Sequence, residues 1–573
     1  MFYKIFNFRN GSRKEETFVN PSNLYKEDLG YGFFTEEARK DNENLNLPEL
    51  NSGFDVWYWL QGKSITNIQI DEEGCYIDDE VGNIPLSFKL DVPHTGNYLV
   101  TIELFNELEG SNLILFTGRR RFVFKKNELE KGERITYTCN VNVCDIIPRG
   151  KETRYRDLTL DISIIGKKIH ISRLEIKENP SSTIFIAGDS TVTDQPASYP
   201  YDPGVSYSGW GQGLTLFVTP EIAISNHAHS GLTTESFRSE GHYDIILDSI
   251  KPGDYCMFQF AHNDQKLSHL KHNEGYRNNL ITYINEIRAR GAYPILVTPI
   301  CRNTWRGTDG TYHDLLVDYA TTCIELGREM DVPVVDLHRR SYEFITSLGL
   351  EAAKRYFYPG DYTHSNDYGA YLMAHFVALE LSAHYNFITL NNYSNWIAPN
   401  EIKVPTPPKG SNYVIPGSNE VKVNFTDIMN SQYKKEIQAL TSQAILPNDN
   451  LYRPIDFVTR VEALSFVVKL YGFFATNVYN DMFTDIVGHE WYAGIVECAC
   501  SNGIFDMKLV KDRLFEPNRT ITYNELYSYC VNGYKSRKQF LDRNIGEDLN
   551  LEADHIITRE ECAALLYRFK EVY

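Results

Sequence analysis

The chain has 573 residues, of which 57 are basic and 76 acidic, and its net charge is −19. This length exceeds one ordinary hydrophobic core, so several domains are expected, and a hydrophobic content of 42% excludes a disordered chain. The negative charge argues against nucleic acid or an anionic membrane as a partner.

The start of the chain and the cysteines bear on the compartment. Residues 1–10 contain no apolar run long enough for a signal peptide, and no stretch of about 20 apolar residues could span a membrane. The ten cysteines form no Cys-x-x-Cys pair and no zinc spacing. A reduced compartment or an anaerobic habitat is therefore favoured over a disulfide framework.

Residues 1–180 show short runs of alternating polarity, at 86–92, 98–102 and 158–164. Period-two strands at this spacing predict an antiparallel β-sandwich. A run of three arginines, Arg119-Arg120-Arg121, follows an expected strand at 113–116. We interpret it as a solvated strand edge and not as a binding patch, because charges commonly protect edges.

The pattern changes in residues 181–397. Nearly continuous apolar runs at 183–187, 222–225, 255–260, 295–298 and 332–337 alternate with helical patterns at 276–290 and 312–330. This alternation predicts a doubly wound α/β domain whose parallel sheet is covered on both faces.

Residues 398–420 are rich in proline and glycine and are expected to form a linker. Residues 421–573 contain an internal repeat, because Phe425-Thr426-Asp427-Ile428 returns as Phe483-Thr484-Asp485-Ile486. A threonine followed by glutamate three residues later recurs at Thr459, Thr522 and Thr558. This is the pattern of a capping box, so we predict α-helical repeats.

The polar residues that follow the apolar runs suggest chemistry. Ser190 ends a buried strand in Gly-Asp-Ser, and a serine nucleophile needs an imidazole within reach and a carboxylate to orient it. Asp361 and His364 can supply both from one loop. The Ser190 and Gly231 amides and the Asn263 side chain could stabilise an oxyanion. Each segment taken alone could also be a turn, a cap or a polar loop.

Taken together, five ordered motifs resemble the SGNH (GDSL) hydrolases, above all their rhamnogalacturonan acetylesterase branch, over roughly residues 181 to 390. The motifs are Gly188-Asp189-Ser190-Thr191, Gly209-Trp210-Gly211, the segment from Asn226 to Phe237, His262-Asn263-Asp264 and Asp361-x-Thr363-His364. The resemblance implies a flavodoxin-like three-layer α/β fold and deacetylation of a plant cell-wall polysaccharide. It also implies Ser190 as nucleophile, Gly231 and Asn263 as oxyanion donors, and Asp361 with His364 as the rest of the triad.

The chain departs from the family pattern at two positions. Ala261 stands where the family usually has glycine before His-Asn-Asp, which costs little if its backbone φ is negative. Leu232 stands where an arginine is frequent. As further substrate contacts we expect Trp210, which could equally fill core, and His262.

The flanking regions also resemble known modules. The N-terminal region is similar to galactose-binding-like β-sandwiches attached to pectin-active enzymes, and the C-terminal repeats resemble S-layer homology domains, which bind bacterial cell-wall polysaccharide. Arg460 and Arg559, which open two repeat helices, could bind anionic wall glycan or cap the surface of their own helices. We favour binding, because the motif recurs while the surrounding apolar residues vary.

We therefore expect a carbohydrate O-acetylesterase that uses no metal and no other cofactor, with an acetylated polysaccharide as substrate. Two alternatives remain: a surface scaffold with a residual hydrolase domain, and an SGNH lipase or thioesterase. Localisation is left open, because the repeats suggest the cell surface whereas the missing signal peptide suggests the cytoplasm.

Overall fold

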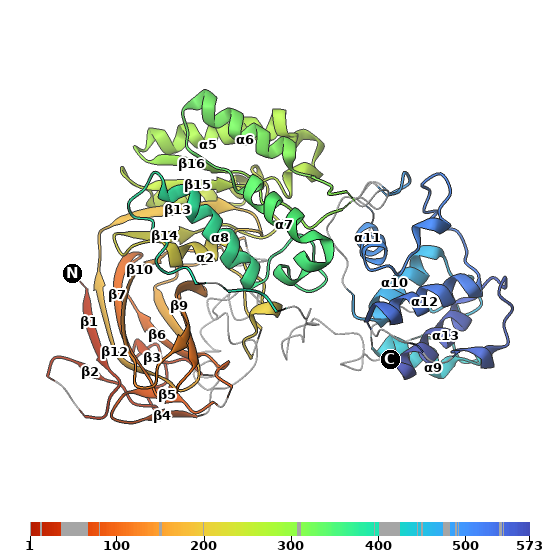
Figure 1. The fold of residues 1–573 in the computed structure, drawn as a ribbon, viewed down its shortest axis with the longest axis horizontal. Coiled ribbons are helices and arrows are strands. Elements are labelled where there is room, and N and C mark those ends of the chain that lie inside the picture. The colour runs from red at the N-terminus through yellow and green to blue at the C-terminus, as the bar shows by residue number, and fades with distance from the viewer. Residues whose placement is uncertain are drawn as a thin grey trace.

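The computed structural model (Figure 1) describes residues 2–11, 14–35, 67–79, 81–147, 152–198, 200–305, 311–394, 396–399, 425–443, 445–447, 451–473, 482–486, 490, 492–537, 541 and 544–573. Most of the expected linker at 398–420 lies outside the described residues. Three regions follow one another along the chain: an antiparallel β region, a mixed α/β region and a helical region.

The N-terminal region is a sandwich of two β-sheets that enclose one apolar core. One sheet has the order β3-β6-β11-β8-β9, and the other runs β10-β7-β12-β1-β2, with β5 paired to β12 and β4 paired to β5. All neighbours pair antiparallel except β1 and β2. The strands are β1 (Tyr3–Asn7), β2 (Thr17–Phe18), β3 (Tyr31–Phe33), β4 (Ile68–Ile70), β5 (Cys75–Ile77), β6 (Leu86–Asp91), β7 (Gly96–Asn106), β8 (Ser111–Thr117), β9 (Arg121–Leu129), β10 (Arg134–Val143), β11 (Thr159–Ile165) and β12 (Ile169–Glu178).

The central region contains a parallel sheet in the order β14-β13-β15-β16-β17. Numbered from β13, this order is 2-1-3-4-5, that of flavodoxin-like doubly wound sheets. Its strands are β13 (Ser182–Gly188), β14 (Ile222–Asn226), β15 (Tyr255–Gln259), β16 (Tyr293–Val297) and β17 (Val334–Val335). Its helical segments are η3 (Pro203–Val205), α2 (Trp210–Leu214), η4 (Thr215–Phe217), α3 (Ser236–Ser239), α4 (His242–Ser249), η5 (Asp264–Lys266), η6 (Ser268–Leu270), η7 (His272–Tyr276), α5 (Arg277–Ala289), α6 (Val317–Met330), α7 (Leu337–Ala353), η8 (Lys354–Tyr356) and α8 (Asp367–Ser382).

Both faces of the parallel sheet are buried, which explains the continuous apolar runs. On β13, Ile184 and Ile186 pack into the core below α2 and α8, whereas Phe185 and Ala187 pack into the core below α4, α5 and α6. One expected strand, 332–337, is shorter than predicted. The side chain of Asp336 accepts a hydrogen bond from the Arg339 N–H and begins α7 at Leu337.

The sandwich and the parallel sheet are joined edge to edge. Strand β10 pairs parallel with β14, with Val141 opposite Ile224, so that 12 of the described strands form one sheet across both regions. Figure 1 shows the strands of this sheet running without interruption from β1 to β16. The change of sequence pattern near residue 181 therefore falls inside a continuous sheet.

The C-terminal region has its own apolar core. Its helices are α9 (Lys434–Ser442), α10 (Arg460–Leu470), α11 (Ala493–Ser501), η9 (Met507–Leu509), α12 (Tyr523–Arg537), η10 (Glu547–Leu549) and α13 (Arg559–Val572). Full capping boxes begin α10 at Thr459 and α13 at Thr558, as predicted. The Asp427 carboxylate accepts the Tyr452 N–H at 2.9 Å, and Asp485 accepts the Phe515 N–H at 2.8 Å, so the sequence repeat is also a structural repeat.

The repeats close into a ring, which corrects the expected role of two arginines. Single β-bridges join Thr459 to Thr520, Thr522 to Ile556, and Thr558 to Phe457. The side chains of Arg460 and Arg559 are both buried. Arg460 pairs with Glu525 at 3.1 Å, and Arg559 pairs with Glu462 at 2.6 Å. They link neighbouring repeats, so they are not placed to bind wall glycan.

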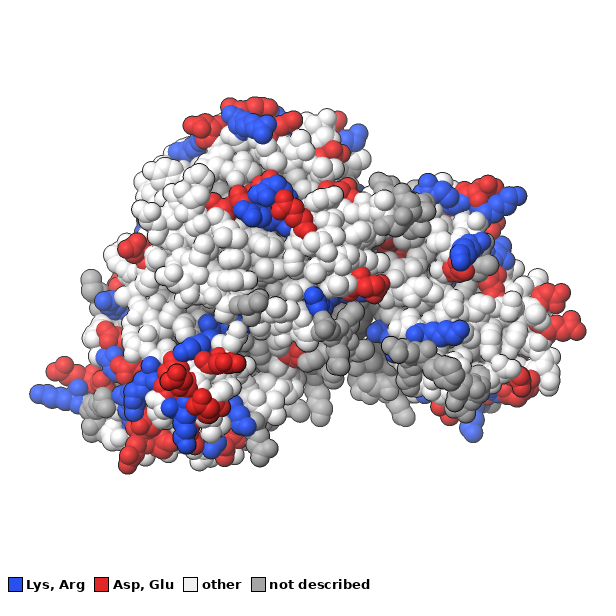
Figure 2. All heavy atoms as spheres, viewed as in Figure 1, with Lys and Arg blue, Asp and Glu red and all other residues white. Residues whose placement is uncertain are grey.

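The molecular surface mixes charges of both signs. Figure 2 shows Lys and Arg beside Asp and Glu in small mixed clusters on one face, with wide uncharged areas over the central region. No described helix is long and apolar enough to cross a membrane.

Candidate active site

The candidate nucleophile lies just after β13 in a tight turn. Ser190 is 8% exposed, and the Asp189 side chain accepts hydrogen bonds from the N–H and the hydroxyl of Thr191 at 3.0 and 2.8 Å. A Cβ on Gly188 would approach the Gln259 carbonyl to 2.8 Å, so glycine is required where the strand ends. The serine is thus held at the carboxyl edge of the sheet, where open α/β sheets bind ligands.

The structure brings the three expected triad residues together. Ser190 Oγ lies 2.8 Å from His364 Nε2, and His364 Nδ1 lies 2.7 Å from Asp361 Oδ2. The other oxygen of Asp361 accepts the Thr363 and His364 backbone N–H groups at 2.7 and 3.0 Å. This loop fixes the carboxylate, and the carboxylate in turn fixes the imidazole tautomer that leaves Nε2 able to accept the serine proton.

The environment keeps Asp361 ionised. Burial alone would raise its pKa, but the His364 side chain and the backbone N–H groups outweigh burial and hold the pKa below its ordinary value of 3.8. The imidazolium that forms when Ser190 is deprotonated would therefore face a carboxylate. The catalytic roles themselves stay a prediction.

Two of the three expected oxyanion donors are backbone N–H groups that are available to a ligand. Among the described residues, neither the Ser190 N–H nor the Gly231 N–H donates to a protein acceptor. Gly231 is exposed, with φ of +86°, a conformation that glycine adopts freely. The Asn263 amide donates to the Leu232 carbonyl at 3.0 Å and accepts from Lys266 Nζ at 2.9 Å, so one of its N–H bonds remains for a ligand.

Asp264 joins the two loops that carry these donors. Its carboxylate accepts the Thr234 N–H at 2.9 Å and the Ala261 N–H at 3.2 Å. Burial raises the pKa of Asp264 to about 6. The segments of Gly231 and Asn263 are therefore positioned by one buried carboxyl group.

Two expected substrate contacts are corrected by burial. Trp210 is 1% exposed and donates its ring N–H to Gln259 Oε1 at 2.8 Å in the core beside α2. His262 is also 1% exposed, and its ring nitrogens lie 3.2 Å from Asp189 Oδ2 and 3.0 Å from the Ile300 carbonyl. Both side chains hold the site from behind instead of lining a sugar pocket.

Alanine at position 261 was expected to cost little if its backbone φ were negative, and the structure shows a positive φ. Its φ is +115°, a conformation that disfavours residues with a Cβ, and its side chain is fully buried. Alanine therefore holds a backbone conformation that glycine adopts more easily, at a cost of about 1–3 kcal/mol.

The arginine run is part of the site's support, which corrects its interpretation as a solvated edge. Arg120 is 1% exposed, pairs with Asp367 at 2.7 Å and donates to the Gln195 carbonyl at 2.9 Å. Arg119 donates to the Asn226 carbonyl at 2.5 Å, and Arg119 and Arg121 both approach Asp194. The sandwich thus supports the loops that follow β13 and β14.

Gln195 connects this support to the nucleophile. Its side-chain amide donates to the Ser190 carbonyl at 3.3 Å and to Ser230 Oγ at 3.2 Å. Sequence reasoning missed Gln195, because a single glutamine in a loop carries no pattern. The arginine run was visible in the sequence, but its partners were not.

One cluster has side chains of the types that bind metals. Ligand atoms of Cys301, Asp314 and His338 lie within 4.8 Å of one another. His338 Nδ1 faces the Pro299 carbonyl at 3.0 Å and Nε2 faces Asp314 at 2.9 Å. Burial alone would lower the pKa of His338, but its bonds to Asp314 and Cys301 raise it to about 10. Both ring nitrogens then carry protons, so the cluster is an ion pair and not a ready metal site.

Comparison with known proteins gives one family. Residues 186–372 match the family described as GDSL-like lipase/acylhydrolase. A rhamnogalacturonan acetylesterase of Bacillus subtilis (strain 168) is 34% identical over 208 residues, which are 34% of this chain and 87% of that protein. A rhamnogalacturonan acetylesterase of Emericella nidulans is 26% identical over 219 residues, 34% of this chain and 82% of that protein. The crystal structure of the YxiM protein of Bacillus subtilis is 24% identical and covers 67% of this chain and 98% of its own, with a TM-score of 0.33.

Proposed function

Because the chain belongs to the GDSL-like lipase/acylhydrolase family, we propose that this carboxylic ester hydrolase removes acetyl groups from a plant cell-wall polysaccharide of the pectin or rhamnogalacturonan type. The observation that carries the proposal is the pair of hydrogen bonds from Ser190 through His364 to Asp361. The substrate class is supported by the acetylesterases that the chain resembles.

In the proposed reaction, His364 Nε2 takes the proton of Ser190 Oγ while the oxygen attacks the acetyl carbonyl carbon. The Ser190 and Gly231 amides and the Asn263 side chain stabilise the oxyanion. His364 then gives the proton to the sugar oxygen, and the sugar departs. The acetyl group remains on Ser190 as an ester. A water molecule, deprotonated by His364, attacks this ester, and acetate leaves as Ser190 is restored.

The test is acetate release from acetylated pectin and from p-nitrophenyl acetate by the full chain. We expect Ser190→Ala to lower kcat by about 10³-fold or more on both esters. Ser249→Ala is the matched control, because Ser249 is exposed at the end of α4. Equal rates in Ser190→Ala and the wild type would refute the enzymatic proposal and favour a binding scaffold.

The same assay separates acetylesterase from lipase. Faster turnover of octanoyl than of acetyl esters would contradict an acetylated polysaccharide as the substrate and would favour a long-chain acyl ester. For the flanking regions, a galactose-binding-like role of the sandwich and wall attachment through the C-terminal repeats remain proposals. Any wall attachment would use surfaces other than Arg460 and Arg559, because those side chains are buried.

A further inference from the structure

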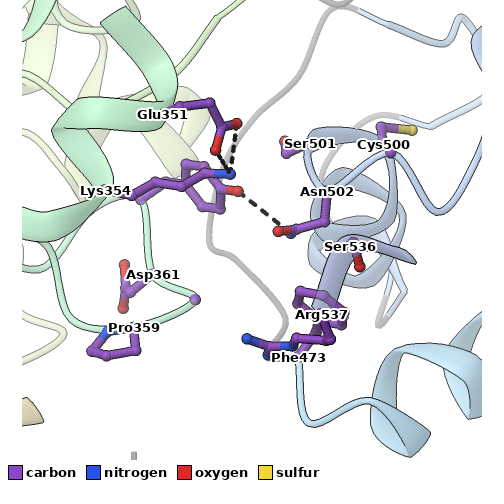
Figure 3. A pocket seen from close by; sticks show the side chains of 13 residues that line it. Glu351, Lys354, Pro359, Asp361, Phe473, Cys500, Ser501, Asn502, Ser536 and Arg537 are labelled. Atoms are coloured by element: carbon purple, nitrogen blue, oxygen red, sulfur yellow. Dashed lines mark hydrogen bonds and ion pairs between the residues drawn. The ribbon is translucent and has the colours of Figure 1, made fainter. Parts of the chain in front are cut away.

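A cavity of about 660 Å³ separates the central region from the C-terminal helices. One wall is Lys354 with the segment from Pro359 to Tyr362, which contains Asp361, and the other includes Asn502 and Arg537. Figure 3 shows the two walls facing each other. Ser190 and His364 do not line this cavity, so a ligand held there would not occupy the reacting centre.

Arg537 is the distinctive group of the cavity. Its Nε donates to the Tyr471 carbonyl at 3.0 Å, its Nη2 donates to the Gly472 carbonyl at 2.9 Å, and its guanidinium lies 3.8 Å from the centre of the Phe473 ring. These contacts hold one edge of the guanidinium rigidly. In Figure 3 the group extends from α12 into the cavity, toward Pro359 and Asp361.

No carboxylate among the described residues forms an ion pair with Arg537. The other cation of the cavity, Lys354, is neutralised by Glu351 at 2.9 Å. Burial lowers the pKa of Arg537, so its charged form is held at a cost that a bound anion would offset. A rigid, unpaired guanidinium is suited to a planar carboxylate.

The rest of the lining is suited to a sugar. The Asn502 amide donates to the Tyr362 hydroxyl at 3.4 Å and bridges the two walls, and the hydroxyls of Ser501 and Ser536 line the same cavity. Hydroxyl and amide groups around a single charge are the polar groups that fix a small polar ligand. A neutral sugar could hydrogen-bond to these hydroxyl and amide groups, but it would leave the Arg537 guanidinium without an anionic partner.

We propose that this cavity is an accessory site for a carboxylate-bearing sugar, a uronate unit of the acetylated polysaccharide, with Arg537 binding its carboxylate. The assignment of the sugar to the substrate rests on the proposed function. Since the segment of Asp361 forms one wall, a uronate bound there holds an acidic chain beside the catalytic loop. Such a site raises kcat/KM for an acidic polymer and leaves a small neutral ester unaffected.

The test compares Arg537→Gln with Lys535→Gln in the full chain. Lys535 lies exposed on the same helix and has the same charge, so it is the matched control. We expect titration calorimetry with unacetylated oligogalacturonate to show Kd about tenfold higher for Arg537→Gln and unchanged for Lys535→Gln. Arg537→Lys, which keeps the charge but loses the planar fork, should be intermediate, and thermal unfolding identifies variants that have lost their fold.

Equal Kd in Arg537→Gln and the wild type would overturn the proposal. The proposal would also be overturned if the wild type bound a neutral galacto-oligosaccharide, or acetate alone, as tightly as it binds oligogalacturonate. The first ligand lacks the carboxylate, and the second lacks the sugar. Hydrolysis of p-nitrophenyl acetate should be the same in all three variants and the wild type. If that hydrolysis proved independent of Ser190, the proposed function would fail while the binding result stood.

Discussion

Ala261 is strained where the site needs a precise backbone. Its φ of +115° is costly for a residue with a Cβ, yet its N–H must reach Asp264 to join two loops of the site. We expect Ala261→Gly to stabilise the protein by about 1 kcal/mol, because relief of strain exceeds the added chain entropy. Urea unfolding followed by tryptophan fluorescence measures the difference.

The control for this substitution is Ala223→Gly. Ala223 is also fully buried, but it lies in β14 with negative φ. Glycine there should destabilise the protein by about 1 kcal/mol. Equal destabilisation by both substitutions would show that the backbone at Ala261 is not strained.

Asp361 gives the site a predictable response to pH. Its folded pKa lies below the ordinary 3.8, so its ionised form stabilises the fold above that pH, and this contribution is lost as pH falls through the folded pKa. We expect the difference in unfolding free energy between wild type and Asp361→Asn to shrink as pH falls below about 3.8.

Urea unfolding at several pH values tests this expectation, and a difference that grows below about pH 3.8 would contradict it. At pH 7 the same substitution should lower kcat by about 10³- to 10⁴-fold, since asparagine cannot hold the reactive imidazole tautomer. Thr363 and His364 retain an acceptor in the asparagine carbonyl, so the loop should keep its shape.

At the scale of elements, the turn between β8 and β9 links the sandwich to the loops of the candidate active site. The side chains of Arg120 and Asp367 are both fully buried, and Asp367 opens α8, three residues after His364. We expect Arg120→Ala to destabilise the protein by about 3–5 kcal/mol, because it leaves a buried carboxylate unpaired. Thermal and urea unfolding provide the measurement.

Arg134→Ala is the matched control for Arg120. The Arg134 side chain is 56% exposed and pairs with Glu73 at the surface, so its loss should cost less than about 1 kcal/mol. A similar small cost at Arg120 would mean that the buried pair contributes little to the attachment of the sandwich.

The parallel α/β sheet could be predicted from the alternation of apolar runs and helical patterns. The convergence of Ser190, Asp361 and His364 could be predicted from the ordered motifs that resemble those of the SGNH hydrolases. The role of Arg120 could not, since Asp367 is 247 residues away and a charge run by itself is typical of solvent. Trp210 shows a similar limit: an aromatic residue in a family motif does not reveal whether it faces ligand or core.

At the scale of the whole molecule, the repeats illustrate what sequence periodicity leaves out. The capping boxes at Thr459 and Thr558 were readable, because all their groups lie within four residues. The pairing of Arg460 with Glu525 was not, because it exists only once the repeats have closed into a ring. Recurrence of a residue type is therefore as compatible with assembly between repeats as with ligand binding.

The pairing of β10 with β14 has a consequence for any attempt to isolate the central region. Cut free near residue 181, that region would keep β14 as a bare edge with unsatisfied backbone groups. Such an edge recruits strands from other molecules, so an excised hydrolase would tend to self-associate. In the full chain the N-terminal sandwich covers this edge through β10, and we expect it to prevent such association.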